Sequence, residues 1–267
     1  TRVTFGPVGV VLAIMPWNFP FWQVFRAALP ALMGGNAMLL KHAHNVPGCS
    51  CALAALFADA GLPAGLFQAL LIDKSPVPGL LADPRVGAVT LTGSTAAGKS
   101  VAALAGAAMK PGVFELGGSD PAIVLADADL AAAAETCAVA RLLNSGQSCI
   151  CSKRFIVVRS VRREFEERFV ARMAARRVGN PIDPATAVGP LAFAELRTEL
   201  QAQVTASAGR IRERSSARRR VATSNKNSTT AQNSSKFQMS SEAVGGGREQ
   251  RRSFRPARQV SALRRTC

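Results

Sequence analysis

Short apolar runs alternate with helix-like stretches over residues 1–208, and this alternation limits the chain to few folds. The run VGVVLAIM at 8–15 contains no polar side chain, which is typical of a strand buried on both faces of a sheet. Similar runs follow at 36–41, 66–72, 86–92 and 121–126. We therefore expect a sheet of largely buried strands.

The segments between these runs have the ends and the spacing of helices. Residues 47–61 begin at Pro and end at Gly, and residues 94–109 begin at a Ser that can serve as N-cap. Residues 128–143 form another predicted helix. Residues 161–177 are also predicted to be helical. We expect one apolar face of this helix to contain Phe165, Phe169, Val170 and Met173. Strands that alternate with helices predict an α/β fold with a doubly wound parallel sheet.

The basic character of the chain is concentrated at its C-terminal end. The whole chain has 33 Lys and Arg against 17 Asp and Glu, a net charge of +16. Residues 1–208 hold 18 basic and 14 acidic side chains (net +4), whereas residues 209–267 hold 15 and 3 (net +12). Residues 209–267 also lack an apolar period, so we expect a disordered, low-complexity basic tail.

Two interpretations of residues 209–267 stay open. A tail rich in Arg and Ser can bind nucleic acid weakly by releasing counterions. The same composition is also typical of an out-of-frame translation of a GC-rich gene. We prefer the second interpretation, and we do not expect nucleic acid among the partners of this chain.

The composition disfavours several classes of protein. No basic segment followed by an apolar one marks a signal peptide, and the apolar runs are too short to span a membrane. The six Cys are irregularly spaced, which disfavours a disulfide scaffold, and Cys-X-Cys pairs beside only two His do not make a zinc motif. We expect a reduced, cytoplasmic protein with no metal site.

Four motifs contain side chains that catalysis needs. Asn18 in PWNFPFW can donate to an oxygen that gains charge, and the Gly-Ser pair in LTGSTAAGK begins a helix whose N–H groups attract phosphate. Glu115 in FELGGSDP lies in an apolar segment, which would suit a general base. Cys149 in NSGQSCICSKR is a candidate nucleophile. Each motif alone also has an ordinary explanation: a turn, a helix start, an ion pair or a small buried residue.

Together, in this order and at these spacings, the motifs resemble the aldehyde dehydrogenase superfamily. The resemblance covers about residues 3–208 and rests on Asn18, Lys41, Gly93-Ser94, Glu115 and Cys149. The stretches KHA, ELGGSDP and GQSCICSKRF are most similar to the succinate-semialdehyde dehydrogenase branch, which uses NAD(P). The resemblance implies a partial Rossmann-like cofactor domain at 1–118 and a partial α/β catalytic domain at 119–208.

The resemblance also implies roles for single residues. Cys149 would attack the aldehyde carbon, Asn18 and the Cys149 backbone N–H would hold the oxyanion, and Glu115 would activate the water that releases the acid. The residues implied at the NADP or NAD site are Lys41, His44, Gly93, Ser94, Trp17, Gly98 and Leu116. His44 stands where NAD-preferring members carry a Glu, so we expect NADP to be accepted.

The expected substrate is succinate semialdehyde or a similar semialdehyde, oxidised to its carboxylic acid. The resemblance implies Arg26 and Trp22 as substrate residues, with Arg26 meeting the distal carboxylate. The Arg that some semialdehyde-oxidising members carry six residues before the nucleophile is Leu143 here. Plain aliphatic or aromatic aldehydes therefore stay open as substrates.

The remaining cysteines have simpler expected roles. We expect Cys49, Cys51 and Cys137 to be packing residues. Cys151 has two open interpretations: an inert side chain, or a partner of Cys149 in a disulfide that switches activity off.

The chain also departs from the family pattern. It begins close to its first predicted strand, and the resemblance fades before a Glu-containing ExFGP motif and before the arm that joins subunits in homo-oligomeric relatives. We expect a chain truncated at both ends, with an apolar sheet face in water and little activity of its own. Two other functions stay open. One is a CoA-acylating relative, which Glu115 disfavours because hydrolysis needs that base. The other is a non-enzymatic remnant with a nucleic-acid-binding tail.

Overall fold

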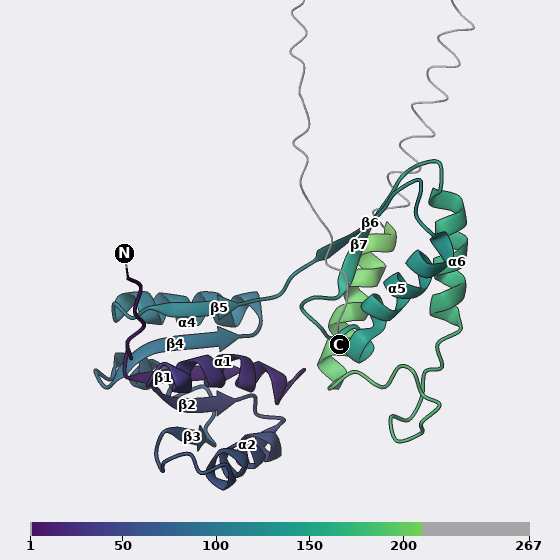
Figure 1. Ribbon diagram of the computed structural model, residues 1–267. Coiled ribbons are helices and arrows are strands. Elements are labelled where there is room, and N and C mark those ends of the chain that lie inside the picture. The colour runs from purple at the N-terminus through teal and green to yellow at the C-terminus, as the bar shows by residue number, and fades with distance from the viewer. Residues whose placement is uncertain (1, 210–267) are drawn as a thin grey trace, which may run out of the picture. The chain divides into compact units, whose positions relative to one another are not determined.

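The computed structural model describes residues 2–209 (Figure 1). The chain divides into two units, residues 1–198 and 199–267. In the second unit only residues 199–209 are described, and they are helical. The expected disordered tail at 209–267 therefore lies, apart from Gly209, outside the described residues.

Five parallel strands form one sheet in the order β3-β2-β1-β4-β5 (Figure 1). The strands are β1 (Val10–Met15), β2 (Ala37–His42), β3 (Phe67–Leu70), β4 (Val86–Thr92) and β5 (Gly112–Glu115). β1 lies at the centre and pairs with both β2 and β4, so the chain winds outward in both directions from it. The predicted doubly wound α/β fold is confirmed.

Helices cover both faces of this sheet. The helices α1 (Trp22–Met33) and α2 (Pro47–Asp59) pack on one face, and α3 (Val77–Ala82) and α4 (Thr95–Ala107) pack on the other. Alternate side chains of β1 point to opposite faces. Val11, Ala13 and Met15 join the first core, whereas Leu12 joins the second. This confirms a strand buried on both faces, which spans Val10–Met15 of the run at 8–15; Val8 and Gly9 are exposed.

Two predicted helix starts have the expected local chemistry. Ser94 is the N-cap of α4, and its Oγ accepts a hydrogen bond from the backbone N–H of Ala97 at 3.2 Å. Pro47 is the first residue of α2, where its missing N–H costs nothing. Strand β5, helix α3 and the later strand at Ser152–Val157 were not predicted; β5 and α3 have only a few residues each.

A second sheet contains the parallel strands β6 (Asp120–Val124) and β7 (Ser152–Val157). The helices α5 (Leu130–Leu142) and α6 (Arg162–Ala174) enclose its core with Val124 and Phe165. Phe155, Phe165 and Phe169 contact one another with ring centroids 4.7–6.4 Å apart. Val170 is 64% exposed, so its predicted place on the apolar face of α6 is wrong. It lies five residues after Phe165, on another side of the helix.

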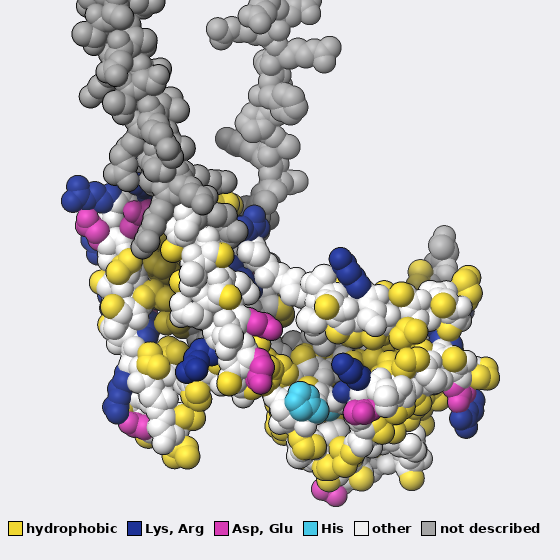
Figure 2. Space-filling model, turned by 180° about the vertical axis from the view of Figure 1, so that it is seen from behind, with side chains coloured by type: hydrophobic (Ala, Val, Ile, Leu, Met, Phe, Trp, Pro, Cys, Tyr) yellow, Lys and Arg dark blue, Asp and Glu magenta, His cyan; other side chains and the backbone are white. Residues whose placement is uncertain are grey.

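The opposite face of the β6–β7 pair is open. Ile123 and Ile156 are paired in the register and are 64% and 52% exposed. Leu125 is also exposed. Hydrophobic side chains reach the molecular surface in several places (Figure 2). The expected apolar sheet face in water is therefore present.

Candidate active site

The predicted site residues collect at one edge of the five-stranded sheet. Asn18 follows β1, Lys41 lies at the end of β2, Gly93 follows β4, and Glu115 ends β5. The strands are parallel and their register places these ends level with one another. In open α/β sheets, ligands bind at this carboxyl edge, near the point where the strand order reverses. That point lies here between β1 and β4.

Asn18 connects this edge to the segment that carries Cys149. The side-chain Nδ2 of Asn18 donates a hydrogen bond to the backbone carbonyl of Gln147 at 2.8 Å. The side-chain Nδ2 of Asn144 donates back to the Asn18 carbonyl at 2.7 Å. The Oδ1 atom of Asn18 is buried and has no partner among the described residues. One N–H of its amide group is also left for another acceptor.

The loop before Cys149 has an unusual backbone. Residues 144–146 have φ values of 50°, 58° and 79°, in the left-handed region that non-glycine residues avoid. Such conformations persist only where the surroundings fix them. Ser145 Oγ donates to the Gly189 carbonyl at 3.0 Å, and Gln147 Oε1 accepts from the Ala192 N–H at 2.9 Å. The loop is thus held by the sheet edge and by the segment at 189–192.

Cys149 is half-buried, and Cys151 is buried. The Cys151 thiol lies 3.7 Å from the Leu143 carbonyl oxygen, to which it donates. The Lys153 ammonium binds three backbone carbonyls in the turn at 148–151. Neither interpretation of Cys151 is excluded by this arrangement, but a disulfide with Cys149 would require the buried thiol to leave its place.

The other cysteines only partly match their expected packing role. Cys137 is buried, and burial raises the pKa of its thiol, which keeps it protonated and unreactive. Cys49 is half-buried. Cys51 is exposed, so the prediction that it packs is wrong. The buried side of α2 is formed instead by Ser50, Leu53 and Phe57.

Glu115 forms an ion pair with Arg26 of α1, with Glu115 Oε2 and Arg26 Nη2 3.5 Å apart. The Glu115 and Arg26 side chains are 53% and 43% exposed. The expectation of a carboxylate in apolar surroundings is therefore wrong: β5 is an edge strand, so its end faces solvent. Both residues line a cavity of about 670 Å³ between α1 and strands β4 and β5.

A smaller cavity of about 220 Å³ lies beyond the ends of β2 and β3. Its lining includes His44, Asp73 and Ser50, whose buried Oγ has no partner among the described residues. His42 also lines it, and Lys41 donates from Nζ to the His42 carbonyl at 3.0 Å. Burial lowers the pKa of Lys41, and the Asp73 carboxylate opposes that shift. The sequence reasoning missed Asp73, which no motif marked.

His42 is a second residue that the sequence reasoning missed. It is 4% exposed, and its Nδ1 accepts from the Ala43 N–H at 2.9 Å. In that tautomer Nε2 carries the proton and donates to the Pro20 carbonyl at 3.0 Å, whereas a proton on Nδ1 would donate to the Met15 carbonyl at 3.3 Å. Burial is the main cause that lowers the pKa of His42. The neutral ring thus connects β2 to the loop that contains Asn18.

The remaining predicted residues surround this edge. A Cβ on Gly98 of α4 would collide with the Leu116 side chain, so the glycine allows these two to pack closely. The Trp17 ring packs edge-on against Phe193, with centroids 5.4 Å apart. Trp22 begins α1 and is 65% exposed.

Within the described residues, no cluster of three or more His, Cys, Asp or Glu side chains could hold a metal ion. Nor is any described helix long and apolar enough to cross a bilayer.

Comparison with known proteins identifies the family. The model of the aldehyde dehydrogenase family matches residues 1–212. The chain belongs to the aldehyde dehydrogenase family. As the sequence motifs predicted, relatives within this family include succinate-semialdehyde dehydrogenases.

One such relative is succinate-semialdehyde dehydrogenase (NADP(+)) 1 of Mycobacterium bovis, 56% identical over 209 residues, or 78% of this chain and 46% of the relative. The crystal structure of the succinic semialdehyde dehydrogenase of Streptococcus pyogenes with NADP+ is also similar. It has a TM-score of 0.73 at 38% identity, over 75% of this chain and 44% of that one. The NAD-dependent aldehyde dehydrogenase of Sinorhizobium meliloti has a TM-score of 0.73 at 35% identity, over 76% and 41%. The chain thus spans about half the length of these relatives.

Proposed function

We propose that this chain carries the nucleophile of an NADP-accepting aldehyde dehydrogenase, together with the sheet edge that binds its cofactor. The proposed substrate is a semialdehyde, in the first place succinate semialdehyde, which is oxidised to its acid. The observation that carries this proposal is the hydrogen bond from Asn18 to the Gln147 carbonyl. It joins the loop of Cys149 to the carboxyl edge of the sheet, where a dinucleotide would bind. The names of the similar proteins support the substrate class and NADP.

In the first step the Cys149 thiolate attacks the aldehyde carbon. A carbon–sulfur bond forms and the C=O π electrons move to oxygen, which gives a tetrahedral hemithioacetal oxyanion. The unused N–H of the Asn18 amide and the Cys149 backbone N–H would donate to the developing oxyanion. Donors fixed before the reaction are effective because they need no reorganisation.

The residues at the sheet edge fit a bound NADP. The α4 N-terminus behind Ser94 offers backbone N–H groups to a pyrophosphate, and Gly98 keeps that helix close to Leu116. The small cavity is lined by His44 and by Ser50, whose Oγ has no partner among the described residues. The Lys41 ammonium binds the carbonyl of His42, which also lines it, so Lys41 and His44 would bind the ribose and its 2′-phosphate. When bound, NADP+ would accept the hydride from the substrate carbon, which leaves a thioester on Cys149.

Glu115 would complete the reaction. It takes a proton from a water molecule whose oxygen bonds to the thioester carbon, and the carbon–sulfur bond breaks to release the acid and the Cys149 thiolate. The ion pair with Arg26 keeps this carboxylate at the sheet edge. Among the described residues Arg26 has no partner besides Glu115, so its remaining N–H groups would bind the distal carboxylate of a semialdehyde.

The first covalent step tests this proposal. Succinate semialdehyde should protect Cys149 of the purified chain from alkylation by iodoacetamide, as followed by mass spectrometry of its peptide. The exposed Cys51 is the internal control and should gain no protection. Equal protection of both thiols, or of neither, would contradict the assignment of Cys149.

A further inference from the structure

The Lys153 side chain donates hydrogen bonds to several backbone carbonyls of the turn that carries Cys149. Lys153 Nζ donates to the carbonyls of Ser148 at 3.0 Å, Cys149 at 3.0 Å and Cys151 at 3.4 Å. Lys153 lies on β7, immediately after this turn, so its side chain folds back under it. An ammonium group has three N–H donors and no acceptor, so these three carbonyls use its whole donor capacity.

This contact sets the direction of the Cys149 N–H. The Ser148 carbonyl and the Cys149 N–H belong to one peptide unit, which is planar and trans, so they point in opposite directions. A donor that holds the Ser148 oxygen on one side therefore aims the Cys149 N–H to the other side. Among the described residues no carbonyl or side chain accepts from that N–H. The Cys149 N–H therefore has a fixed direction and is available to donate to an oxyanion.

The ELGG segment restricts the same turn from a second direction. A Cβ built on Gly118 would lie 3.2 Å from the Cys149 carbonyl oxygen, so the backbone of Gly118 packs against it. Arg154 Nε also donates to the neighbouring Ser119 carbonyl at 2.7 Å. The Cys149 peptide units are thus enclosed between this segment and the Lys153 ammonium.

We propose that Lys153 is a positioning residue for the oxyanion site, which acts by fixing the peptide unit between Ser148 and Cys149. The inference rests on the proposed role of Cys149 as nucleophile. Lys153 itself touches no reacting atom. Without the ammonium, the Ser148 carbonyl keeps only the long hydrogen bond from the Cys151 N–H at 3.4 Å. The peptide unit is then held less firmly and can turn, whereas the thiol stays in place.

Two reactions of the same thiol separate positioning from general damage. Aldehyde addition creates an oxyanion that needs the Cys149 N–H. Alkylation by iodoacetamide forms a carbon–sulfur bond while the carbon–iodine bond breaks and iodide leaves, so no oxyanion forms. In Lys153→Met we expect the alkylation rate of Cys149 to stay within about threefold of the unaltered chain. The concentration of succinate semialdehyde that gives half-protection should rise at least about tenfold, as loss of an oxyanion donor predicts.

The control is Lys74→Met, an exposed lysine outside the site, which should match the unaltered chain in both measurements. Unchanged half-protection in Lys153→Met would overturn the inference and leave the proposed function intact. Absence of protection in the unaltered chain would overturn the proposed function, and this inference with it.

If Lys153→Met does not fold, Lys153→Arg provides the same test. A planar guanidinium keeps the charge but cannot direct three N–H groups at three converging carbonyls. We expect weaker aldehyde protection in Lys153→Arg as well. Full protection in that variant would mean that charge alone suffices, which would overturn the positioning role.

Discussion

The Asn18 amide donates to the backbone carbonyl of Gln147, two residues before Cys149, at 2.8 Å. These residues are far apart in sequence, and the bond makes the end of β1 and the loop that carries Cys149 parts of one site. The amide still holds one unused N–H for a substrate oxygen. The contact therefore holds the loop that carries Cys149 against the Asn18 amide, the group proposed as the oxyanion donor.

Replacing Asn18 by Ala should weaken aldehyde addition to Cys149. The change removes both the donor to the oxyanion and the bond to Gln147, so we expect the half-protecting concentration of succinate semialdehyde to rise about 100-fold. The matched control is Asn180→Ala, which removes only a turn contact to Ile182. Equal protection in both variants would contradict the role of Asn18.

Replacing Gly87 by Ala should destabilise the five-stranded sheet. Gly87 lies where the β1–β4 register shifts, and a Cβ there would collide with the backbone carbonyl of Val8. Backbone cannot move aside as a flexible side chain can, so we expect a loss of about 1–3 kcal/mol in the free energy of unfolding. Urea unfolding measures it.

Gly106→Ala is the control for that variant. Gly106 lies in α4, with nothing within 4 Å of the position of a Cβ. Alanine there should raise the free energy of unfolding by about 0.4–1 kcal/mol, because it restricts the unfolded chain. Similar destabilisation by both substitutions would mean that the Val8 contact is not the cause.

Because of His42, the free energy of unfolding should decrease as the pH is lowered below the ordinary pKa of histidine. Burial lowers the pKa of His42 below the usual 6.5. Just below pH 6.5 the ring is therefore protonated in the unfolded chain but still neutral in the folded chain. Its contribution is complete above pH 6.5 and is lost as the pH falls from there toward the folded-state pKa. Thermal unfolding at a series of pH values measures the slope.

The two histidines of the chain allow a matched comparison. His42→Gln should flatten the pH dependence of the melting temperature between pH 7 and 5.5, because Gln does not titrate. His44→Gln, at an exposed position, should leave the slope unchanged. If the slope disappears in His44→Gln instead, the titrating ring is His44 and the prediction for His42 is wrong.

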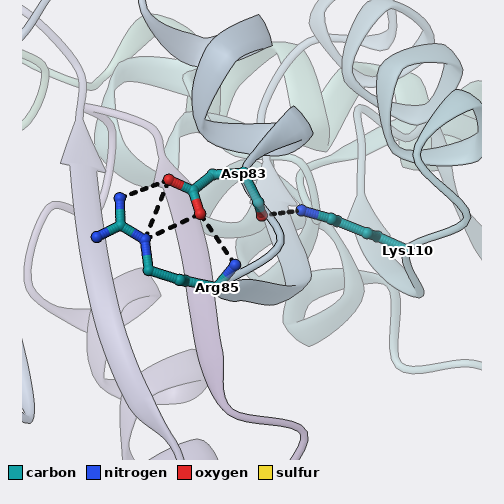
Figure 3. A network of polar contacts seen from close by, with 3 residues as sticks. All are labelled: Asp83, Arg85 and Lys110. Atoms are coloured by element: carbon teal, nitrogen blue, oxygen red, sulfur yellow. Dashed lines mark hydrogen bonds and ion pairs between the residues drawn. The ribbon is translucent and has the colours of Figure 1, made fainter.

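Asp83 should contribute stability that is lost in stronger acid. Its carboxylate binds the side chain and backbone N–H of Arg85, and Lys110 Nζ donates to the Asp83 carbonyl (Figure 3). These hydrogen bonds hold the pKa of Asp83 well below its usual 3.8, so its contribution is present above that value and is lost as the pH falls below it. Asp83→Asn should unfold at a less acidic pH than Asp73→Asn.

The strand ends were the part of the site that the sequence predicted well. Parallel strands end at one edge, so motifs that follow apolar runs must meet there, and Asn18, Lys41 and Gly93 do. The sequence could not predict the surroundings of Glu115. Its short strand is the sheet edge, which exposes the carboxylate and lets Arg26 reach it.

The contacts of Lys153 could not be predicted for another reason. They depend on a turn that follows the left-handed residues 144–146, and non-glycine residues give little sign of such φ values in a sequence. His42 was missed because a buried ring that bonds only to backbone atoms has no motif. The assigned roles of the site residues and the domain boundary at 118 remain predictions.

The central claim, that Cys149 adds to the aldehyde, is tested most directly by carbon NMR with succinate semialdehyde labelled at its aldehyde carbon. Bound to the unaltered chain, that carbon should give the resonance of a tetrahedral carbon bonded to sulfur. The resonance should persist in Cys51→Ser and disappear in Cys149→Ser. A resonance that survives in Cys149→Ser, or none in the unaltered chain, would contradict the account.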